Sequence, residues 1–387
     1  MNESLSLYIH IPFCAASEKR AKCDYCDFYS VIPENADFFD AYINAVIKDV
    51  NNQVDFFKVK EIPAVYIGGG TPSVMGKRIG LLLDALKRIP AFAPVEFTVE
   101  ANPESASEEF LCECREGGVN RLSLGVQTFH EPSRKAVNRI GRLDLLEERL
   151  ALCSAYFPGA LSADLITGLP FQDEKIAEDD ALTLLAFNPA HVSLYSLTLG
   201  ENTNLEKRIN GNEISLPDKD MSDLLWFAAK DVLEAAGFKQ YEVSNFAREN
   251  GRCLHNIRYW RMEGWMGAGP SASGTVIDED EGTAKRFTYA PDVNEYIKNP
   301  RISTAVCENI NKADLMRDSL LMGFRYCEGP DKNLFKNRFA CNIEDCIPQT
   351  LLRWKDGDRM LFLNKFLEQA FEEMETNKFI KRLSASA

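Results

Sequence analysis

The chain contains 387 residues, of which 45% are hydrophobic and 26% are charged, so it can bury a core and is neither disordered nor collagen-like. Lys and Arg number 44 and Asp and Glu number 58, giving a net charge of −14. Because such a chain repels phosphate backbones, we expect no general nucleic-acid binding. No run approaches the roughly 18 apolar residues of a membrane span, and the N-terminus lacks a basic signal-peptide region, so we expect a cytoplasmic protein.

Strand-like and helix-like segments alternate through the first half of the chain. Strands are predicted at residues 7–11, 65–67, 97–99, 122–126, 163–166 and 192–197, and helices at 36–57, 79–89, 107–116, 145–156 and 174–187. Six βα units in about 200 residues predict an α/β fold with a parallel sheet covered by helices. Periodicity leaves open whether the sheet is flat or curled, but it predicts that ligands bind at the carboxyl ends of the strands.

The pattern changes after about residue 205. We predict a helix at 222–236, a short strand at 241–243, an aromatic and glycine-rich stretch at 259–274, and helices at 314–324 and 358–374. The expected organisation is a core at 1–240, an extension at 241–300 and a mostly helical C-terminal domain at 301–387.

Three of the eleven cysteines stand apart from the rest. Most cysteines fit the role of small core residues in a reduced protein. Cys14, Cys23 and Cys26, however, share one loop directly after the first predicted strand. Three thiolates can hold zinc with a fourth ligand from elsewhere, or a [4Fe–4S] cluster that keeps one iron open for a small molecule. Three unpaired thiols are the remaining alternative, and the residues alone leave this choice open.

Polar or glycine residues follow several predicted strands. Residues 68–71 read Gly-Gly-Gly-Thr after the second strand, where glycine lets the backbone approach a ligand. A Walker phosphate loop would also need Gly-Lys-Ser/Thr, which is absent. Glu100, Gln127, Arg139 and Asp164 lie at or after the third, fourth and fifth strands. One such group can be a helix cap or a surface ion pair, but four in succession predict a polar ligand site.

Two short segments carry a resemblance to a known family. Residues 8–14 read YIHIPFC and residues 23–28 read CDYCDF, which resembles the signature of the radical S-adenosylmethionine (radical SAM) enzymes around oxygen-independent coproporphyrinogen III oxidase. Within that group the chain is most similar to the HemW haem chaperone branch, over about residues 5–328. The resemblance implies a radical SAM partial (β/α)6 barrel and a [4Fe–4S] cluster on Cys14, Cys23 and Cys26. One departure is that eight residues separate Cys14 from Cys23, where the family has three.

The resemblance also implies a site for S-adenosylmethionine (SAM). Its expected residues are Tyr8, Tyr25, Gly69, Gly70, Thr71, Glu100, Gln127, Arg139 and Asp164. The carboxylates can accept hydrogen bonds from ribose hydroxyls or the amino group, and Arg139 can pair with a carboxylate. The chemistry would belong to the cofactors, so no catalytic side chain is assigned from the sequence.

A second informative run begins at His255. Residues 255–260 read HNIRYW and resemble the HNxxYW signature of the HemW branch, which is associated with haem binding. By that resemblance His255 is a candidate axial haem ligand, with Cys253 as a rival. A hydrogen-bonded core histidine is the structural alternative.

The resulting hypothesis is a radical SAM protein that binds a [4Fe–4S] cluster, SAM and haem and delivers haem to a recipient protein, which could be membrane-associated. A flavodoxin or ferredoxin would supply electrons. The alternatives are oxygen-independent coproporphyrinogen III oxidase and a non-catalytic metal-binding scaffold. Phe28 stands two residues after Cys26, where the oxidase has a further cysteine, and this argues against oxidase activity. Whether the chain is an enzyme stays open.

Overall fold

The fold is built on six parallel strands in sequential order. The computed structural model describes residues 3–14, 22–33, 35–139, 141–355 and 359–377. The strands are β1 (Ser6–Ile11), β2 (Ile62–Gly69), β3 (Phe92–Ala101), β4 (Arg121–Gln127), β5 (Leu161–Thr167) and β6 (His191–Ser196). Strand β1 pairs with β9 and β6 pairs with β8, so the curled sheet does not close on itself. The predicted α/β partial barrel is therefore confirmed.

Further strands lengthen the sheet at both edges. They are β9 (Trp265–Ala268), β10 (Ser273–Asp278), β11 (Thr283–Thr288) and β12 (Val306–Ile310) beyond β1, and β8 (Asn245–Ala247) and β7 (Lys239–Gln240) beyond β6. The strand predicted at 241–243 is wrong, because these residues form the turn between β7 and β8. The Glu242 carboxylate accepts a hydrogen bond from the Ser244 amide at 3.2 Å, which closes that turn.

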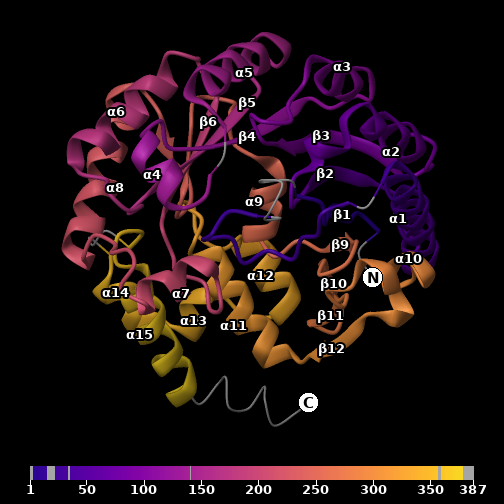
Figure 1. Cartoon of the computed structure of the whole chain (residues 1–387). Coiled ribbons are helices and arrows are strands. Elements are labelled where there is room, and N and C mark those ends of the chain that lie inside the picture. The colour runs from indigo at the N-terminus through magenta and orange to yellow at the C-terminus, as the bar shows by residue number, and fades with distance from the viewer. Residues whose placement is uncertain (1–2, 15–21, 34, 140, 356–358, 378–387) are drawn as a thin grey trace.

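Helices cover the outer face of the parallel strands (Figure 1). They are α1 (Ala36–Phe57), α2 (Ile79–Leu86), α3 (Glu108–Glu116), α5 (Leu143–Tyr156), α6 (Glu174–Leu185) and α8 (Lys219–Ala235), with the shorter η1 (Pro72–Arg78) before α2. The short helices α4 (Glu131–Ala136) and α7 (Asn204–Asn210) lie instead near the carboxyl ends of the strands. Helix α1 shows why these segments are helical, because its buried Ile43, Val46 and Val50 recur at helical spacing. The side chain of Asn35 caps it by accepting from the Phe38 amide at 3.0 Å.

The remaining helices lie in the C-terminal third. They are α9 (Leu254–Trp260), α10 (Val293–Lys298), η2 (Ile302–Thr304), α11 (Lys312–Gly323), α12 (Lys332–Phe339), α13 (Ile343–Cys346), α14 (Pro348–Arg353) and α15 (Leu363–Thr376). The helix predicted from residue 358 begins at Leu363, and residue 358 itself lies outside the described residues. Helices α11 to α15 share a second hydrophobic core with Met262, Ile277 and Ala284 from the extension. The divisions expected at residues 240 and 300 stay predictions.

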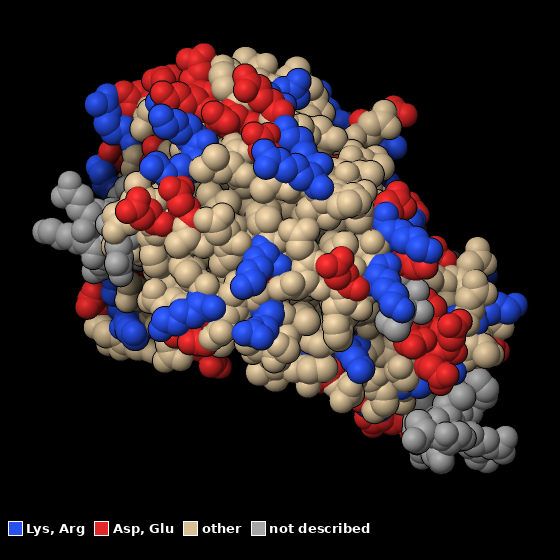
Figure 2. All heavy atoms as spheres, turned by 90° about the vertical axis from the view of Figure 1, so that its right-hand side faces the viewer, with Lys and Arg blue, Asp and Glu red and all other residues tan. Residues whose placement is uncertain are grey.

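Surface charge is mixed on the face shown in Figure 2. Lys and Arg side chains lie among Asp and Glu and between uncharged areas on that face. In the described part of the chain, no helix is both long and apolar enough to cross a membrane.

Candidate functional site

A cavity of about 390 Å³ lies at the carboxyl ends of β2 to β6. We call it the cysteine pocket. Most residues of the predicted cluster and SAM sites line it: Cys14, Cys23, Tyr25, Cys26, Gly69, Gly70, Thr71, Glu100, Gln127, Arg139 and Asp164. Segments that are far apart in sequence meet here because the ends of parallel strands share one edge of the sheet. Tyr8 and His255 line a different cavity.

The sulfur atoms of the three cysteines belong to residues that line the cysteine pocket. The Thr71 hydroxyl donates to the Cys14 sulfur at 3.6 Å, and Arg139 Nη1 donates to the Cys23 sulfur at 3.7 Å. Burial raises the pKa of the Cys26 thiol to about 11, so without a metal this group holds its proton at neutral pH. Metal binding would release that proton.

The arrangement of ligands bears on which metal centre fits. Among the described residues, no three His, Cys, Asp or Glu side chains are grouped to hold one metal ion. Zinc needs its ligands around a single point, whereas a four-iron cluster offers each cysteine a separate iron. Three thiols around one cavity therefore fit a cluster better than zinc. The segment 15–21, which contains most of the long spacer between Cys14 and Cys23, lies outside the described residues.

Gly69 and Gly70 have no room for a side chain, because neighbouring residues of the barrel pack against them. Gly69 has φ 107°, and a Cβ there would collide with the His10 ring. A Cβ on Gly70 would lie 2.6 Å from the carbonyl oxygen of Phe13. The end of β1 thus packs directly on this turn, which leaves the backbone of Gly69 and Gly70 as wall of the cysteine pocket.

A polar network joins the two side chains that donate to the cysteine sulfurs. Asn102 donates to the Thr71 hydroxyl at 3.0 Å and accepts from Arg139 Nη2 at 3.1 Å. Burial opposes the charge on Arg139, but Glu104 and Cys23 outweigh it and raise the pKa of the guanidinium. Its Nε is buried without a partner among the described residues, which leaves one donor for a ligand. Asn102 was not predicted, although it follows Glu100 closely at the same strand end.

Gln127 reaches the cysteine pocket through an irregular strand end. The β4 to β5 pairing shifts register between Gly125 and Gln127, and Gln127 has φ 73°. A left-handed conformation is uncommon for glutamine and often marks a functional position. The bulge turns this side chain toward the cavity, where it lies among the predicted SAM residues.

Two carboxyl groups of the cysteine pocket titrate near neutral pH. Burial raises the pKa of Glu100 to about 7 and that of Asp164 to about 6. Glu100 accepts from the Tyr66 hydroxyl at 2.7 Å and from the Gly69 amide at 3.0 Å. A cationic ligand would favour the ionised form of both groups.

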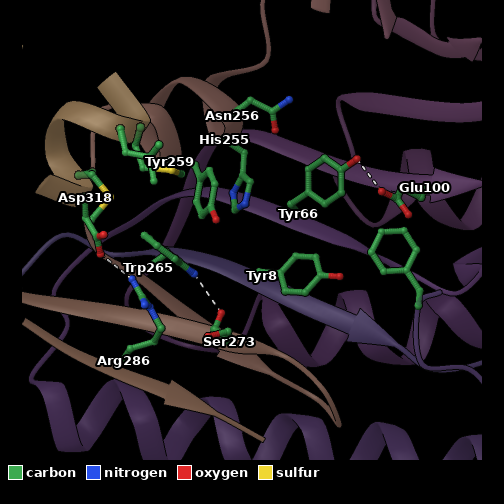
Figure 3. A pocket seen from close by; sticks show the side chains of 14 residues that line it. Tyr8, Tyr66, Glu100, His255, Asn256, Tyr259, Trp265, Ser273, Arg286 and Asp318 are labelled. Atoms are coloured by element: carbon green, nitrogen blue, oxygen red, sulfur yellow. Dashed lines mark hydrogen bonds and ion pairs between the residues drawn. The ribbon is translucent and has the colours of Figure 1, made fainter. Parts of the chain in front are cut away.

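A second cavity, of about 690 Å³, lies between the barrel edge and the C-terminal helices. We call it the histidine pocket. Helix α9 contributes His255, Asn256 and Tyr259, while β9 and β11 contribute Trp265 and Arg286 and α11 contributes Asp318 and Met322 (Figure 3). Tyr8 also lies here, because its register partner across β1 and β2 is Tyr66. Its expected contact with SAM stays a prediction.

The His255 ring makes no hydrogen bond in the described part of the chain, and its Nδ1 is buried without a partner. The described residues thus provide no hydrogen bond of the kind that the structural alternative expects, and the role of His255 as a haem ligand stays a prediction. Burial lowers the pKa of His255 to about 4, which keeps the imidazole neutral and able to bind a metal. Its ring lies 5.2 Å from the Tyr66 ring, centroid to centroid.

Cys253 points away from the histidine pocket. It is 2% exposed, and its thiol donates to Glu96 Oε1 at 3.3 Å. Burial raises the pKa of this thiol to about 12. Of the two candidate haem ligands, His255 is the one that lines the cavity.

The two pockets share a wall. Phe28 and Glu100 line both cavities, and Tyr66 connects Glu100 to the neighbourhood of His255. Tyr66 was not predicted. The sequence did contain a signal for it. Tyr66 stands two positions before Gly68 on β2, and strand alternation places these two residues on the same face of the sheet.

Comparisons with known proteins agree on one family. The radical SAM superfamily model matches residues 8–183. The chain is 36% identical to the heme chaperone HemW of Escherichia coli (strain K12) over 278 residues, 71% of each chain. It is 32% identical over 94% of each chain to the heme chaperone HemW of Lactococcus lactis. It is also 32% identical to the mouse protein radical S-adenosyl methionine domain-containing protein 1, mitochondrial, over 83% of this chain and 73% of that one.

A solved structure shows the same fold. Coproporphyrinogen III oxidase (HemN) from Escherichia coli superposes with a TM-score of 0.78, over 95% of this chain and 90% of the oxidase. The two sequences are 20% identical, so this likeness establishes the fold and not the reaction.

Proposed function

The chain belongs to the HemW family of radical SAM proteins, and from that premise we propose that it is a haem chaperone. In this proposal the cysteine pocket holds a [4Fe–4S] cluster and SAM. The histidine pocket holds haem, which the protein passes to a recipient protein. An electron donor such as a flavodoxin or ferredoxin would serve the cluster.

The cysteine pocket has the residues that the cluster and SAM would need. Cys14, Cys23 and Cys26 would be the protein ligands, and a bound cluster supplies an open iron and one electron. Thr71 and Arg139 donate hydrogen bonds to two of the sulfurs, as they could to thiolates on a cluster. The carboxylates of Glu100 and Asp164 would receive donors from SAM, which carries positive charge at its sulfonium and amino groups.

The observation that carries the haem proposal is the His255 ring. It lines a cavity large enough for a sizeable ligand, has a nitrogen without a partner, and is neutral at physiological pH. Tyr259 and Trp265 add the aromatic surface that suits a flat macrocycle. Its rival Cys253 is bonded to Glu96 instead.

The experiment is a haem titration of anaerobically reconstituted protein, followed by the Soret band. We expect the wild type to bind haem and His255→Ala to bind it more weakly with a shifted band, because iron loses a coordinate bond. Cys253→Ala and His130→Ala should match the wild type, since His130 lines neither cavity. A band that moves only in Cys253→Ala would assign the thiolate instead.

The same protein separates the chaperone from the oxidase. With reductant, SAM and coproporphyrinogen III, we expect no decarboxylation, in line with Phe28 at the position of the oxidase's further cysteine. Conversion to protoporphyrinogen at a catalytic rate would refute the chaperone proposal. Iron and sulfide analysis distinguishes both from a zinc-binding scaffold, because only a cluster contains sulfide.

A further inference from the structure

The histidine pocket has one cationic side chain among the described residues that line it. This is Arg286 of β11, whose Nη2 lies 2.9 Å from Asp318 Oδ2 on α11 and whose Nη1 lies 3.4 Å from Glu308 Oε2 on β12. The side chains of Arg286 and Asp318 are about one-third exposed, at 34% and 30%. Figure 3 shows this pair at the end of the cavity away from Glu100, with His255 between the two ends.

The position of this ion pair suits the anionic edge of a porphyrin. Haem is apolar over most of its surface but carries two propionate carboxylates on one edge. Arg286 has five N–H donors in a planar fork that matches a carboxylate, and two of its nitrogens already bond carboxylates of the protein. Asp318 therefore presents the same chemical group that a propionate would bring.

The pair does little that is purely structural. Partly exposed ion pairs contribute little to stability because water screens them. The packing between this part of the sheet and α11 comes instead from buried apolar residues, among them Ala284, Leu315 and Met316. An ion pair at the rim of an otherwise aromatic cavity is thus better placed to select a ligand than to hold the fold.

We propose that Arg286 binds a propionate carboxylate of haem and that Asp318 competes with this propionate for the guanidinium. The inference rests on the proposed haem function and names the group that the site recognises. It makes the site selective for porphyrins with a free carboxylate at this edge. It also gives the two partners of one ion pair opposite effects on haem affinity.

The test compares hemin with its dimethyl ester in four variants of the full-length, cluster-loaded protein. Arg286→Gln should weaken hemin binding by about tenfold to a hundredfold, because a charge-assisted bond is lost. Asp318→Asn should tighten hemin binding severalfold, since a competing negative charge is removed. The ester should bind the wild type and both variants alike. Arg286→Lys keeps the charge and should lie between wild type and Arg286→Gln.

Arg317→Gln is the matched control. Arg317 directly precedes Asp318 on α11 but does not line the pocket. Its replacement therefore removes one positive charge close to the ion pair without removing a residue of the cavity. A structural ion pair would instead give Arg286→Gln and Asp318→Asn the same direction of change, with equal effects on hemin and ester, and this would overturn the inference. If hemin binds the wild type through His255 but Arg286→Gln binds it equally well, the inference fails while the haem proposal stands. If the wild type binds no hemin, the haem proposal itself fails.

Discussion

The carboxylate of Glu96 holds the start of the helix that carries His255, so its removal should lower both stability and haem affinity. Glu96 lies on β3, and its Oε2 accepts from the Leu254 amide at 2.8 Å. Its Oε1 accepts from the His255 amide at 2.9 Å and from the Cys253 thiol at 3.3 Å. The first amides of a helix have no partner within it. Helix α9 is seven residues long, and its N-cap residue Cys253 provides no side-chain cap, so Glu96 supplies the acceptor.

The expected magnitude follows from the two amide bonds. A hydrogen bond to a charged group contributes about 1.5–3 kcal/mol, but a helix start that frays regains water. We therefore expect Glu96→Ala to lower the free energy of unfolding by about 2–4 kcal/mol, measured by urea denaturation. Haem affinity should fall as well, because His255 is the second residue of the helix.

Cys253→Ala is the matched control, since it removes a weak donor and leaves both amide bonds. It should change the free energy of unfolding by less than about 1 kcal/mol. An unfolding free energy of Glu96→Ala within about 0.5 kcal/mol of wild type would refute the capping argument. A destabilised Glu96→Ala with unchanged haem affinity would show that the helix start does not position the haem ligand.

Three further predictions concern the cysteine pocket. Replacing Cys14, Cys23 and Cys26 together by Ala should abolish iron and sulfide binding after anaerobic reconstitution. The double variant Cys341→Ala with Cys346→Ala is the control and should retain both. Full iron content in the triple variant would place the cluster elsewhere. Asp164→Ala should weaken SAM binding by about tenfold to a hundredfold in calorimetry, and unchanged affinity would remove Asp164 from the site. Burial raises the pKa of Glu100 from 4.5 to about 7. Between these two pH values the folded apoprotein keeps a proton that the unfolded chain has released, so the free energy of unfolding falls as pH rises. Glu100→Gln lacks this titrating group, so its free energy of unfolding should rise relative to that of the wild type by roughly 3 kcal/mol as pH goes from 4.5 to 7. A difference between the two proteins that does not change with pH would contradict the raised pKa.

Sequence patterns predicted the parallel core well, because its strands and helices are local and strongly periodic. The polar groups at strand ends could also be predicted, since parallel strands bring Glu100, Gln127 and Asp164 to one edge whatever the details of packing. Residues that meet only through tertiary packing could not be predicted. Arg286 and Asp318 come from a strand and a helix whose contact no periodicity reveals.

Register explains where Tyr8 lies and why the sequence did not indicate it. The family resemblance placed Tyr8 among the residues of the SAM site. In the sheet, however, β1 pairs with β9 on one side and β2 on the other, with Tyr8 opposite Gly267 and Tyr66. It therefore lies toward the extension strands and His255, a position that depends on strands late in the chain.

Phe28 lies in the wall that separates the two pockets. Phe28 is 60% exposed and lines both pockets, as does Glu100. Its apolar ring lies between a polar pocket with three thiols and an aromatic pocket with a free imidazole. A ligand in either pocket would touch the same two side chains. Glu100 also accepts from Tyr66 on one side and from Gly69 on the other, so the groups expected to hold haem and SAM are joined by consecutive contacts. The two pockets are therefore best treated as one bipartite site.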